Sequence, residues 1–315
     1  MPAEVVRIED PTTGASAEVL VSLGFNCFSW KAPAAGELRE MLWAEEGFAG
    51  GDLRPSRSGT PLLFPFAGRI KDGLFEFEGK EYEIEKTDGL GNAIHGYALR
   101  SPWRVVESAG DRVTAEFQPS VDDPDALGQW TGDYLLTATY ALEGTRLVLD
   151  FSAKNLSDSR MPYAFGTHAY FRIPLADGAE VEQTFVQAPV NALWESKDLI
   201  PTTEATEIGT DEPLPKGAPL DGREFDTPYR FSPGATETLL KDQENGVALR
   251  QTFDDSMTCC VIFTPGHREA ICLEPYTSTP DPFNMQAAGV DSGLRVLEPG
   301  ETYSTKITLE ASSSS

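Results

Sequence analysis

Residues 134–155, YLLTATYALEGTRLVLDFSAKN, indicate the class of fold more clearly than any other stretch of the chain. Apolar and polar side chains alternate on both sides of Glu143-Gly144. A period of two residues is typical of a strand with one buried face, and a short turn that contains glycine is typical of a β-hairpin. The stretch therefore predicts two antiparallel strands joined by a tight turn.

The same pattern recurs along the chain. It surrounds Glu78-Gly79 in residues 74–85 (LFEFEGKEYEIE) and a turn at 109–111 in residues 103–117 (WRVVESAGDRVTAEF). No convincing long amphipathic helix interrupts these segments, so we expect an all-β fold, a large antiparallel β-sandwich. Further strands are expected in residues 5–23, 248–253, 259–264, 270–275 and 302–310.

The chain has 315 residues, and β-sandwiches of that length often form one domain. We find no internal repeat and no clear linker, so we expect a single domain over 1–311. The stretch 201–219, which contains many Thr, Glu and Pro residues, is interpreted as a long loop or an edge excursion. The serines at 312–315 are expected to form a disordered tail.

The composition favours a soluble protein, which we expect to be cytoplasmic and a monomer or homodimer. A formal net charge of −25 disfavours nucleic-acid and membrane-surface partners. The N-terminus shows no signal-peptide pattern, and no apolar run is long enough to span a membrane. The four cysteines form no C-x-x-C pair, so neither a disulfide framework nor a zinc site is expected.

Four segments contain side chains that could carry chemistry. His168, one of three histidines, lies in YAFGTHAYFRIP (163–174), although a lone histidine among apolar residues is more often structural. Glu274 directly follows the apolar run 271–273, where a carboxylate is costly to desolvate without a partner. His95 precedes a glycine in GNAIHGYALRSPW (91–103), and Arg69 follows Gly68 in PLLFPFAGRIKDG (61–73).

Taken in order, these segments resemble the aldose 1-epimerase (galactose mutarotase-like) family. The matching blocks are PFAGRI (65–70), HGYALRSPW (95–103), NLSDSRMPYAFGTHAYF (155–171) and CLEPYTSTPDPFN (272–284), of which the last two are the most specific. The resemblance implies the galactose mutarotase-like supersandwich. It also implies a cofactor-independent isomerase with Glu274 as general base, His168 as general acid, and His95 and Arg69 as sugar-binding residues.

The family also has a sugar-binding aspartate before an aromatic residue. Asp226 in EFDTPYRF (224–231) matches it, with Asp221 as a rival. The chain departs from the usual pattern at Gly68, where relatives often have Asn, at Tyr97 after His-Gly, and at TSTPD (277–281). These departures leave the identity of the sugar open.

The implied reaction is the interconversion of the α and β anomers of a free aldose. A base removes the proton of the C1 hydroxyl while an acid protonates the ring oxygen, and closure on the other face follows rotation about C1–C2. A carboxylate and an imidazolium on opposite sides of the ring suit this exchange, and each transfer is typically worth about 10²–10⁴-fold in rate. We expect a nearby carboxylate to favour protonated His168. No cofactor and no metal is needed.

Three alternatives have different requirements. A hexose-6-phosphate 1-epimerase would need extra cations, and a non-catalytic carbohydrate-binding protein would not need a matched Glu274–His168 pair. A metal-dependent cupin-type enzyme usually has an H-x-H pair, which is absent, and His267 is the only spare histidine.

The net charge also bears on the choice of sugar. A charge of −25 opposes the approach of a sugar phosphate, so free sugars are expected to be preferred. A local pair of cations could reverse that preference. The candidates near the site blocks are Arg69, Lys71, Arg100 and Arg172.

Overall fold

The hairpin predicted at residues 134–155 is present in the computed structural model, which describes residues 3–313. Strand β12 (Tyr134–Glu143) pairs antiparallel with β13 (Arg146–Asn155) along its whole length. Burial alternates along β12 up to Glu143, as the period of two requires. Gly144 adopts a positive φ of 66° in the turn, a conformation that glycine tolerates best.

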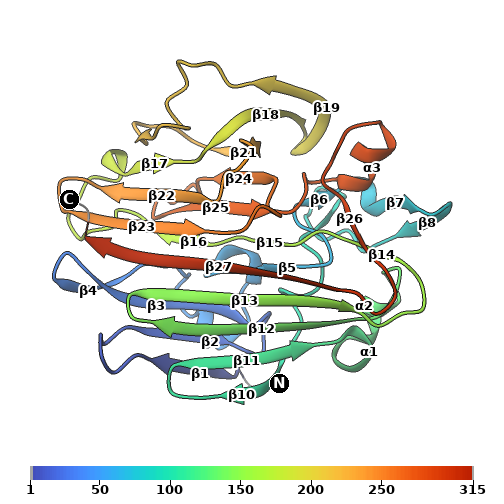
Figure 1. Cartoon of the computed structure of the whole chain (residues 1–315), viewed down its shortest axis with the longest axis horizontal. Helices are drawn as coiled ribbons and strands as arrows, with labels where there is room; N and C mark the ends of the chain where they lie inside the picture. The colour runs from blue at the N-terminus through green and yellow to red at the C-terminus, as the bar shows by residue number, and fades with distance from the viewer. Residues whose placement is uncertain (1–2, 314–315) are drawn as a thin grey trace.

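This hairpin forms the middle of a nine-stranded antiparallel sheet, which is one layer of the molecule (Figure 1). Strand β27, near the end of the chain, lies between β13 and β23 and joins the two halves of the sheet. In spatial order the strands are β10 (Arg104–Ser108), β11 (Arg112–Phe117), β12, β13, β27 (Thr302–Ser313), β23 (Val247–Thr252), β22 (Glu237–Asp242), β17 (Phe185–Gln187) and β20 (Ala218–Pro219).

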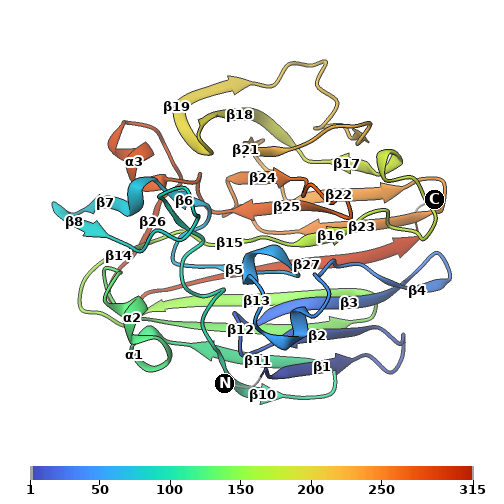
Figure 2. The same ribbon diagram turned by 180° about the vertical axis from the view of Figure 1, so that it is seen from behind.

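Two further antiparallel sheets make up the second layer, seen from behind in Figure 2. One contains β1 (Val5–Glu9), β2 (Ser16–Leu20), β3 (Asn26–Ala34) and β4 (Glu37–Glu40). Bridges from Cys27 to Thr60 and from Leu42 to Phe171 connect it to the other sheet. That eight-stranded sheet contains, in order, β19 (Ile200–Glu207), β18 (Val190–Lys197), β21 (Asp226–Phe231), β24 (Cys259–Phe263), β25 (Ala270–Tyr276), β15 (Gly166–Thr167) and β5 (Leu62–Leu63), with β16 (Tyr170–Arg172) also paired to β25.

Short elements connect the strands at the edges of the layers. The two-stranded pairs are β6 (Arg69–Ile70) with β9 (Ala93–Ile94), β7 (Leu74–Phe77) with β8 (Lys80–Glu83), and β14 (Met161–Tyr163) with β26 (Arg295–Leu297). The helices are α1 (Pro119–Asp122), α2 (Pro124–Leu127) and α3 (Pro282–Ala287), and the 3₁₀ turns are η1 (Phe48–Gly50), η2 (Pro55–Arg57), η3 (Lys71–Gly73) and η4 (Val181–Gln183).

The core lies between the two layers and contains many aromatic side chains among its aliphatic ones. Phe151 of β13 stacks on Phe165, which precedes β15, at a ring-centroid distance of 4.1 Å. Tyr140 of β12 reaches across the core and places its hydroxyl 2.9 Å from that of Thr60. Because a buried hydroxyl without a partner would be costly, this contact fixes how the layers sit against each other.

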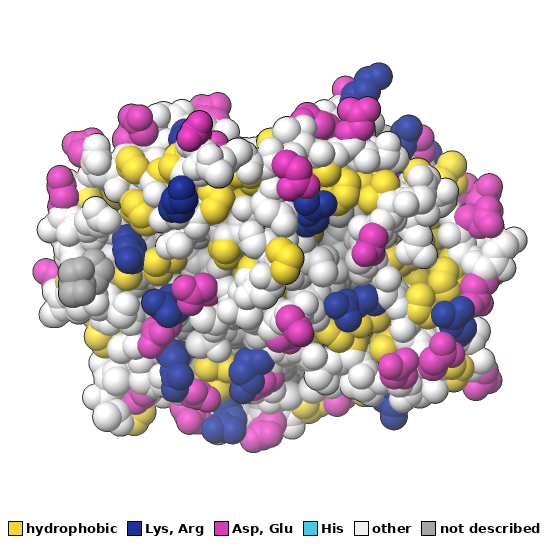
Figure 3. All heavy atoms as spheres, turned by 45° about the horizontal axis from the view of Figure 1, so that its top comes forward, with side chains coloured by type: hydrophobic (Ala, Val, Ile, Leu, Met, Phe, Trp, Pro, Cys, Tyr) yellow, Lys and Arg dark blue, Asp and Glu magenta, His cyan; other side chains and the backbone are white. Residues whose placement is uncertain are grey.

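The charged surface is mixed rather than divided into patches. On the face shown in Figure 3, basic side chains are interspersed with acidic ones. Most arginines accordingly lie within ion-pair distance of a carboxylate, as Arg230 does with Glu207 at 2.6 Å. Such exposed pairs each contribute little to stability, about 0–1 kcal/mol.

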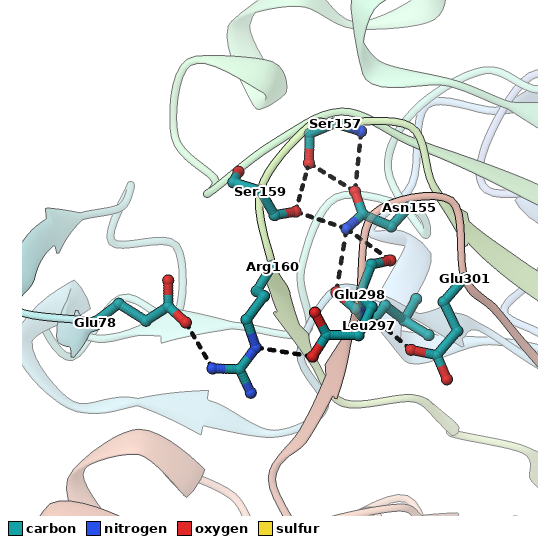
Figure 4. Close-up of polar contacts among 8 residues, drawn as sticks. All are labelled: Glu78, Asn155, Ser157, Ser159, Arg160, Leu297, Glu298 and Glu301. Atoms are coloured by element: carbon teal, nitrogen blue, oxygen red, sulfur yellow. Dashed lines mark hydrogen bonds and ion pairs between the residues drawn. The ribbon is translucent and has the colours of Figure 1, made fainter.

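A polar cluster anchors the segment that leads from β13 to β14 (Figure 4). The amide of Asn155 donates hydrogen bonds to the carbonyls of Ser159, Leu297 and Glu298 at 2.8–3.2 Å. Arg160 pairs with both Glu78 and Glu298. The cluster therefore fixes the start of the NLSDSRMPYAFGTHAYF block, whose later residues contain His168.

Two segments contain more strand structure than their composition predicts. Within the stretch 201–219, interpreted as a loop or edge excursion, residues up to Glu207 continue β19, the edge strand of the eight-stranded sheet. The disordered tail expected from residue 312 is wrong for Ser312 and Ser313, which end β27 and pair with β23, because an unpaired strand edge there gives them backbone partners. Residues 314–315 lie outside the described part of the chain.

The cysteines and helices agree with a β-protein. All four cysteines are buried and free, and Cys259-Cys260 lies in β24 as expected. Among residues 3–313, no helix has the length and apolar character needed to cross a bilayer.

Candidate active site

The pairing of β25 with β15 and β16 brings two of the predicted residues face to face. The register pairs Gly166 with Tyr276 and Tyr170 with Cys272, so His168 lies opposite Glu274. Their side chains meet with His168 Nε2 3.4 Å from Glu274 Oε1. Residues separated by more than one hundred positions in the chain thus come into contact.

This pair lies at the floor of a cleft of about 710 Å³ on the eight-stranded sheet. All five predicted site residues line the cleft. Asp221, the rival of Asp226, does not. The structure therefore gathers the following residues around one space: Arg69, His95, His168, Asp226 and Glu274.

Glu274 is held in an environment that opposes its ionisation. Its side chain is buried, and Oε1 has no hydrogen-bond partner among residues 3–313. Burial raises the pKa of Glu274 well above its usual value, and the charge of Asp226 adds to this. The hydroxyl of Tyr276 donates to Oε2 and opposes the rise in pKa.

His168 lies flat against Tyr170, with ring centroids 4.8 Å apart and ring planes inclined by 2°. Burial lowers the pKa of His168 to about 3. The expectation that the nearby carboxylate keeps His168 protonated is therefore wrong for this cleft. The loss of water around an imidazolium outweighs the contact with Glu274, and the same loss of water raises the pKa of Glu274.

His95 follows β9 in a left-handed backbone conformation, with φ at 66°. Gly68 N–H donates to His95 Nδ1 at 3.3 Å, so the ring proton is on Nε2. Its ring meets that of His168 edge-on at 5.4 Å. A Cβ at Gly96 would lie 2.2 Å from the carbonyl oxygen of Phe64, which explains the glycine after His95.

The glycine at position 68 also has a physical reason. Gly68 has a φ of 72°, and a Cβ there would lie 2.6 Å from Cβ of Pro280. Any larger residue at 68, such as the asparagine often found in relatives, would collide with this proline. Two departures from the family pattern, Gly68 and the TSTPD stretch, are therefore parts of one packing arrangement.

Arg69 and Asp226 both line the cleft. Arg69 of β6 pairs through Nε with Asp88 Oδ2 at 3.1 Å, and the side chain of Asp88 is fully buried. Asp226, the first residue of β21, is exposed to the cleft, yet partial desolvation raises its pKa. Both side chains can hydrogen-bond to a polyol in the cleft.

Several cleft residues were not predicted from the sequence. Tyr276 lies two residues after Glu274, so the period of two could have placed it on the same face. Tyr170 follows His168 by the same spacing. Asp88 gave no local signal, since its role depends on β6. His267, noted only as spare, lines the cleft and stacks on Trp43 at 4.1 Å.

Three side chains come close enough to hold a metal ion. Donor atoms of His168, Cys272 and Glu274 all lie within 4.8 Å of one another. A metal needs the thiolate and carboxylate forms of such ligands. Burial raises the pKa of the Cys272 thiol and of Glu274 well above their usual values, so binding of a cation would require both groups to lose a proton.

The other predicted phosphate-binding candidates lie elsewhere. Arg100 pairs with Glu85 and Arg172 with Asp177, and neither lines the cleft. Lys71 lines a separate groove. Of the four candidates only Arg69 faces the acid/base pair.

Comparison with known proteins identifies the family. The sequence profile of the aldose 1-epimerase family matches residues 4–310. The chain belongs to the aldose 1-epimerase family. A galactose mutarotase from Sus scrofa is 25% identical over 68% of this chain and 58% of the relative. The uncharacterized protein YphB of Escherichia coli is 22% identical over 78% of this chain and 81% of that protein.

Solved structures of similar proteins share the fold of this family member. A galactose mutarotase-like protein from Clostridium acetobutylicum superposes with a TM-score of 0.85 at 22% identity, covering 99% of both chains. An aldose epimerase homologue from C. elegans gives a TM-score of 0.81 at 20% identity, covering 99% of this chain and 100% of that one. The expected all-β, galactose mutarotase-like sandwich is therefore confirmed.

Proposed function

We propose that this family member is a cofactor-independent aldose 1-epimerase that interconverts the α and β anomers of a reducing aldose, with Glu274 and His168 as the acid/base pair. One observation carries the proposal, the 3.4 Å contact of Glu274 with His168 on the cleft floor. The reaction exchanges protons at O1 and O5. Both oxygens are bonded to C1, so an acid and a base in contact with each other can serve both, in place of the arrangement on opposite sides of the ring that the reaction alone led us to expect.

The protonation states define a sequence of steps. The pair holds one proton, which burial places on Glu274. Its transfer across the contact to His168 Nε2 gives a carboxylate and an imidazolium without any change in total charge. The carboxylate then takes the O1 proton, and the C1–O5 bond breaks as His168 protonates O5. Rotation about C1–C2 and the reverse transfers close the ring on the other face of the aldehyde.

The remaining cleft residues support binding in this proposal. His95 presents an N–H donor beside His168, while Arg69, held by buried Asp88, and Asp226 supply a donor and an acceptor for hydroxyls. A non-catalytic sugar-binding protein would use these groups equally well. Such a binding protein would gain nothing from Glu274 Oε1, because a buried carboxyl oxygen without a hydrogen-bond partner is costly.

The test is anomer equilibration, followed by polarimetry or NMR in the presence of EDTA across a panel of hexoses and pentoses. We expect catalysis above the buffer rate for at least one sugar. Glu274→Gln keeps the shape but cannot accept a proton, so kcat should fall about 10²–10⁴-fold with little change in affinity. Glu76→Gln, an exposed glutamate on β7, is the matched control. Near-normal kcat in Glu274→Gln would exclude the proposed base.

A further inference from the structure

Two arginines in the cleft lack the partners that other arginines have. Among residues 3–313, every arginine forms an ion pair with a carboxylate except Arg54, Arg57 and Arg295. Arg295 donates instead to the carbonyl of Ser256. Arg54 and Arg57 line the cleft; Arg54 Nε donates to Ser56 Oγ at 3.1 Å, and neither arginine has a carboxylate partner. Free arginines are unexpected in a chain with twice as many acidic as basic residues.

These two arginines flank one rigid turn. Arg54 is the N-cap of η2 and Arg57 is its last residue. The two arginines stand at the two ends of this turn, and both line the same cleft. Tyr170 fixes the turn, since its hydroxyl donates to the carbonyl of Ser56 at 2.9 Å, and it also stacks on His168.

The position of the turn relative to the reacting groups follows from the order of strands. Across the sheet, β21 with Asp226 is followed by β24, then β25 with Glu274, then β15 and β16 with His168 and Tyr170. The turn joined to Tyr170 therefore lies beyond His168, on the side away from Asp226. In a pyranose bound with O1 at Glu274 and O5 at His168, C5 and its substituent extend to that side.

We propose that Arg54 and Arg57 form a subsite for an anionic group on the C5 substituent of the sugar, either a phosphate on C6 or the carboxylate of a uronic acid. The proposal rests on the proposed function for the orientation of the ring. Paired arginines are well suited to bidentate recognition of phosphate and carboxylate groups. No cleft carboxylate competes for them, because Glu45, also on the wall, pairs with neither.

The subsite revises the preference expected from net charge. The charge of −25 is spread over the whole surface, and beyond about 8 Å it is screened at physiological ionic strength. In the proposed subsite, two guanidinium groups without a carboxylate partner act at contact distance on the bound sugar. The net charge therefore slows the arrival of an anionic sugar, while Arg54 and Arg57 determine how tightly it is held.

The first experiment compares kcat/KM for glucose, glucose 6-phosphate and glucuronate. We expect at least one anionic sugar to exceed glucose by about tenfold or more, since a hydrogen bond to a charged group contributes about that factor. The anionic sugar with the higher kcat/KM shows whether the subsite recognises a phosphate or a carboxylate. In the double variant Arg54→Gln/Arg57→Gln the preference should disappear while kcat/KM for glucose stays within about twofold. Arg172→Gln, an exposed paired arginine outside the cleft, is the control and should retain the preference.

The second experiment separates the subsite from the catalytic proposal. Glu274→Gln is titrated calorimetrically with the same sugars, with and without the double arginine change. Tighter binding of an anionic sugar that the double change removes would support the subsite even if no sugar is turned over. Binding of this kind without any turnover would overturn the proposed function but not the subsite. Equal affinity for glucose and both anionic sugars, or a preference that survives the double change, would overturn the subsite.

Discussion

In the proposed mechanism Glu274 and His168 share one proton, and this determines the pH profile that we expect. Loss of that proton requires the pH to exceed the raised pKa of Glu274, and addition of a second requires it to fall below about 3, the pKa of His168. Because the two groups interact, these are values of the pair. We expect kcat/KM to be bell-shaped, with its alkaline limb well above pH 4.5. A profile that rises with pH through the neutral range would contradict a shared proton.

Tyr276 is expected to tune this pair. Its hydroxyl donates to Glu274 and stabilises the carboxylate. In Tyr276→Phe the pKa of Glu274 should rise further, so the alkaline limb should move to higher pH, and kcat should fall about tenfold because the ionic form becomes rarer. Tyr82→Phe, on β8 outside the cleft, is the control. An unchanged limb would assign Tyr276 a packing role only.

Glu274 should also limit stability. Its folded-state pKa is raised above the unfolded value, so the folded state binds the extra proton, and stability is lost as pH rises from about 4.5 through the folded pKa. Glu274→Gln does not ionise, so its Tm should exceed that of the natural protein by a margin that widens with pH. Thermal unfolding at pH 5 and pH 8 measures this margin. A margin independent of pH would mean that Glu274 is not desolvated.

At the scale of elements, the pairing of β15 with β25 holds the site together. Gly166 of β15 lies opposite Tyr276, and a Cβ there would lie 2.2 Å from the tyrosine ring. Gly166→Ala should therefore displace the buried ring of Tyr276 and with it the Glu274 carboxyl group. We expect kcat/KM to fall about 10²-fold, as a displacement near 1 Å can cause, and stability to fall by about 1–3 kcal/mol.

The control for this change is Gly110→Ala, in the turn between β10 and β11. A Cβ at Gly110 has nothing within 4 Å, and the residue does not need a positive φ. Its effect on stability should stay within about 0.5 kcal/mol. If both variants behave alike, the pairing of Gly166 with Tyr276 does not hold the catalytic carboxyl in place.

At the scale of the molecule, stability depends on β27, which joins the two halves of the nine-stranded sheet. Ile307 is buried in the core, and Ile307→Ala should lower the free energy of unfolding by about 2–5 kcal/mol. Urea denaturation measures the change. Lys306→Gln, next in the chain but exposed and paired with Asp150, should cost no more than about 1 kcal/mol. Similar losses in both variants would mean that the core does not depend on this strand.

The sequence by itself determined the class of fold and singled out the two residues that we propose as the acid/base pair. Apolar and polar residues alternate every two residues along a strand, so the hairpins at 74–85, 103–117 and 134–155 can be predicted from neighbouring residues alone. Glu274 and His168 could also be singled out from the sequence. A carboxylate after an apolar run and a histidine among aromatic residues are locally unusual, and both residues lie in the blocks that resemble the family.

Only the tertiary structure decided which groups meet and in which protonation state. The contact between His168 and Glu274 depends on strand register. The pairing of Arg69 with Asp88 depends on the separate two-stranded pair β6–β9. The neutral state of His168 reflects desolvation by all the surrounding strands, a quantity that no local segment contains. Arg54 and Arg57 carried no sequence signal for the same reason. An arginine is notable only when the folded chain leaves it without a partner.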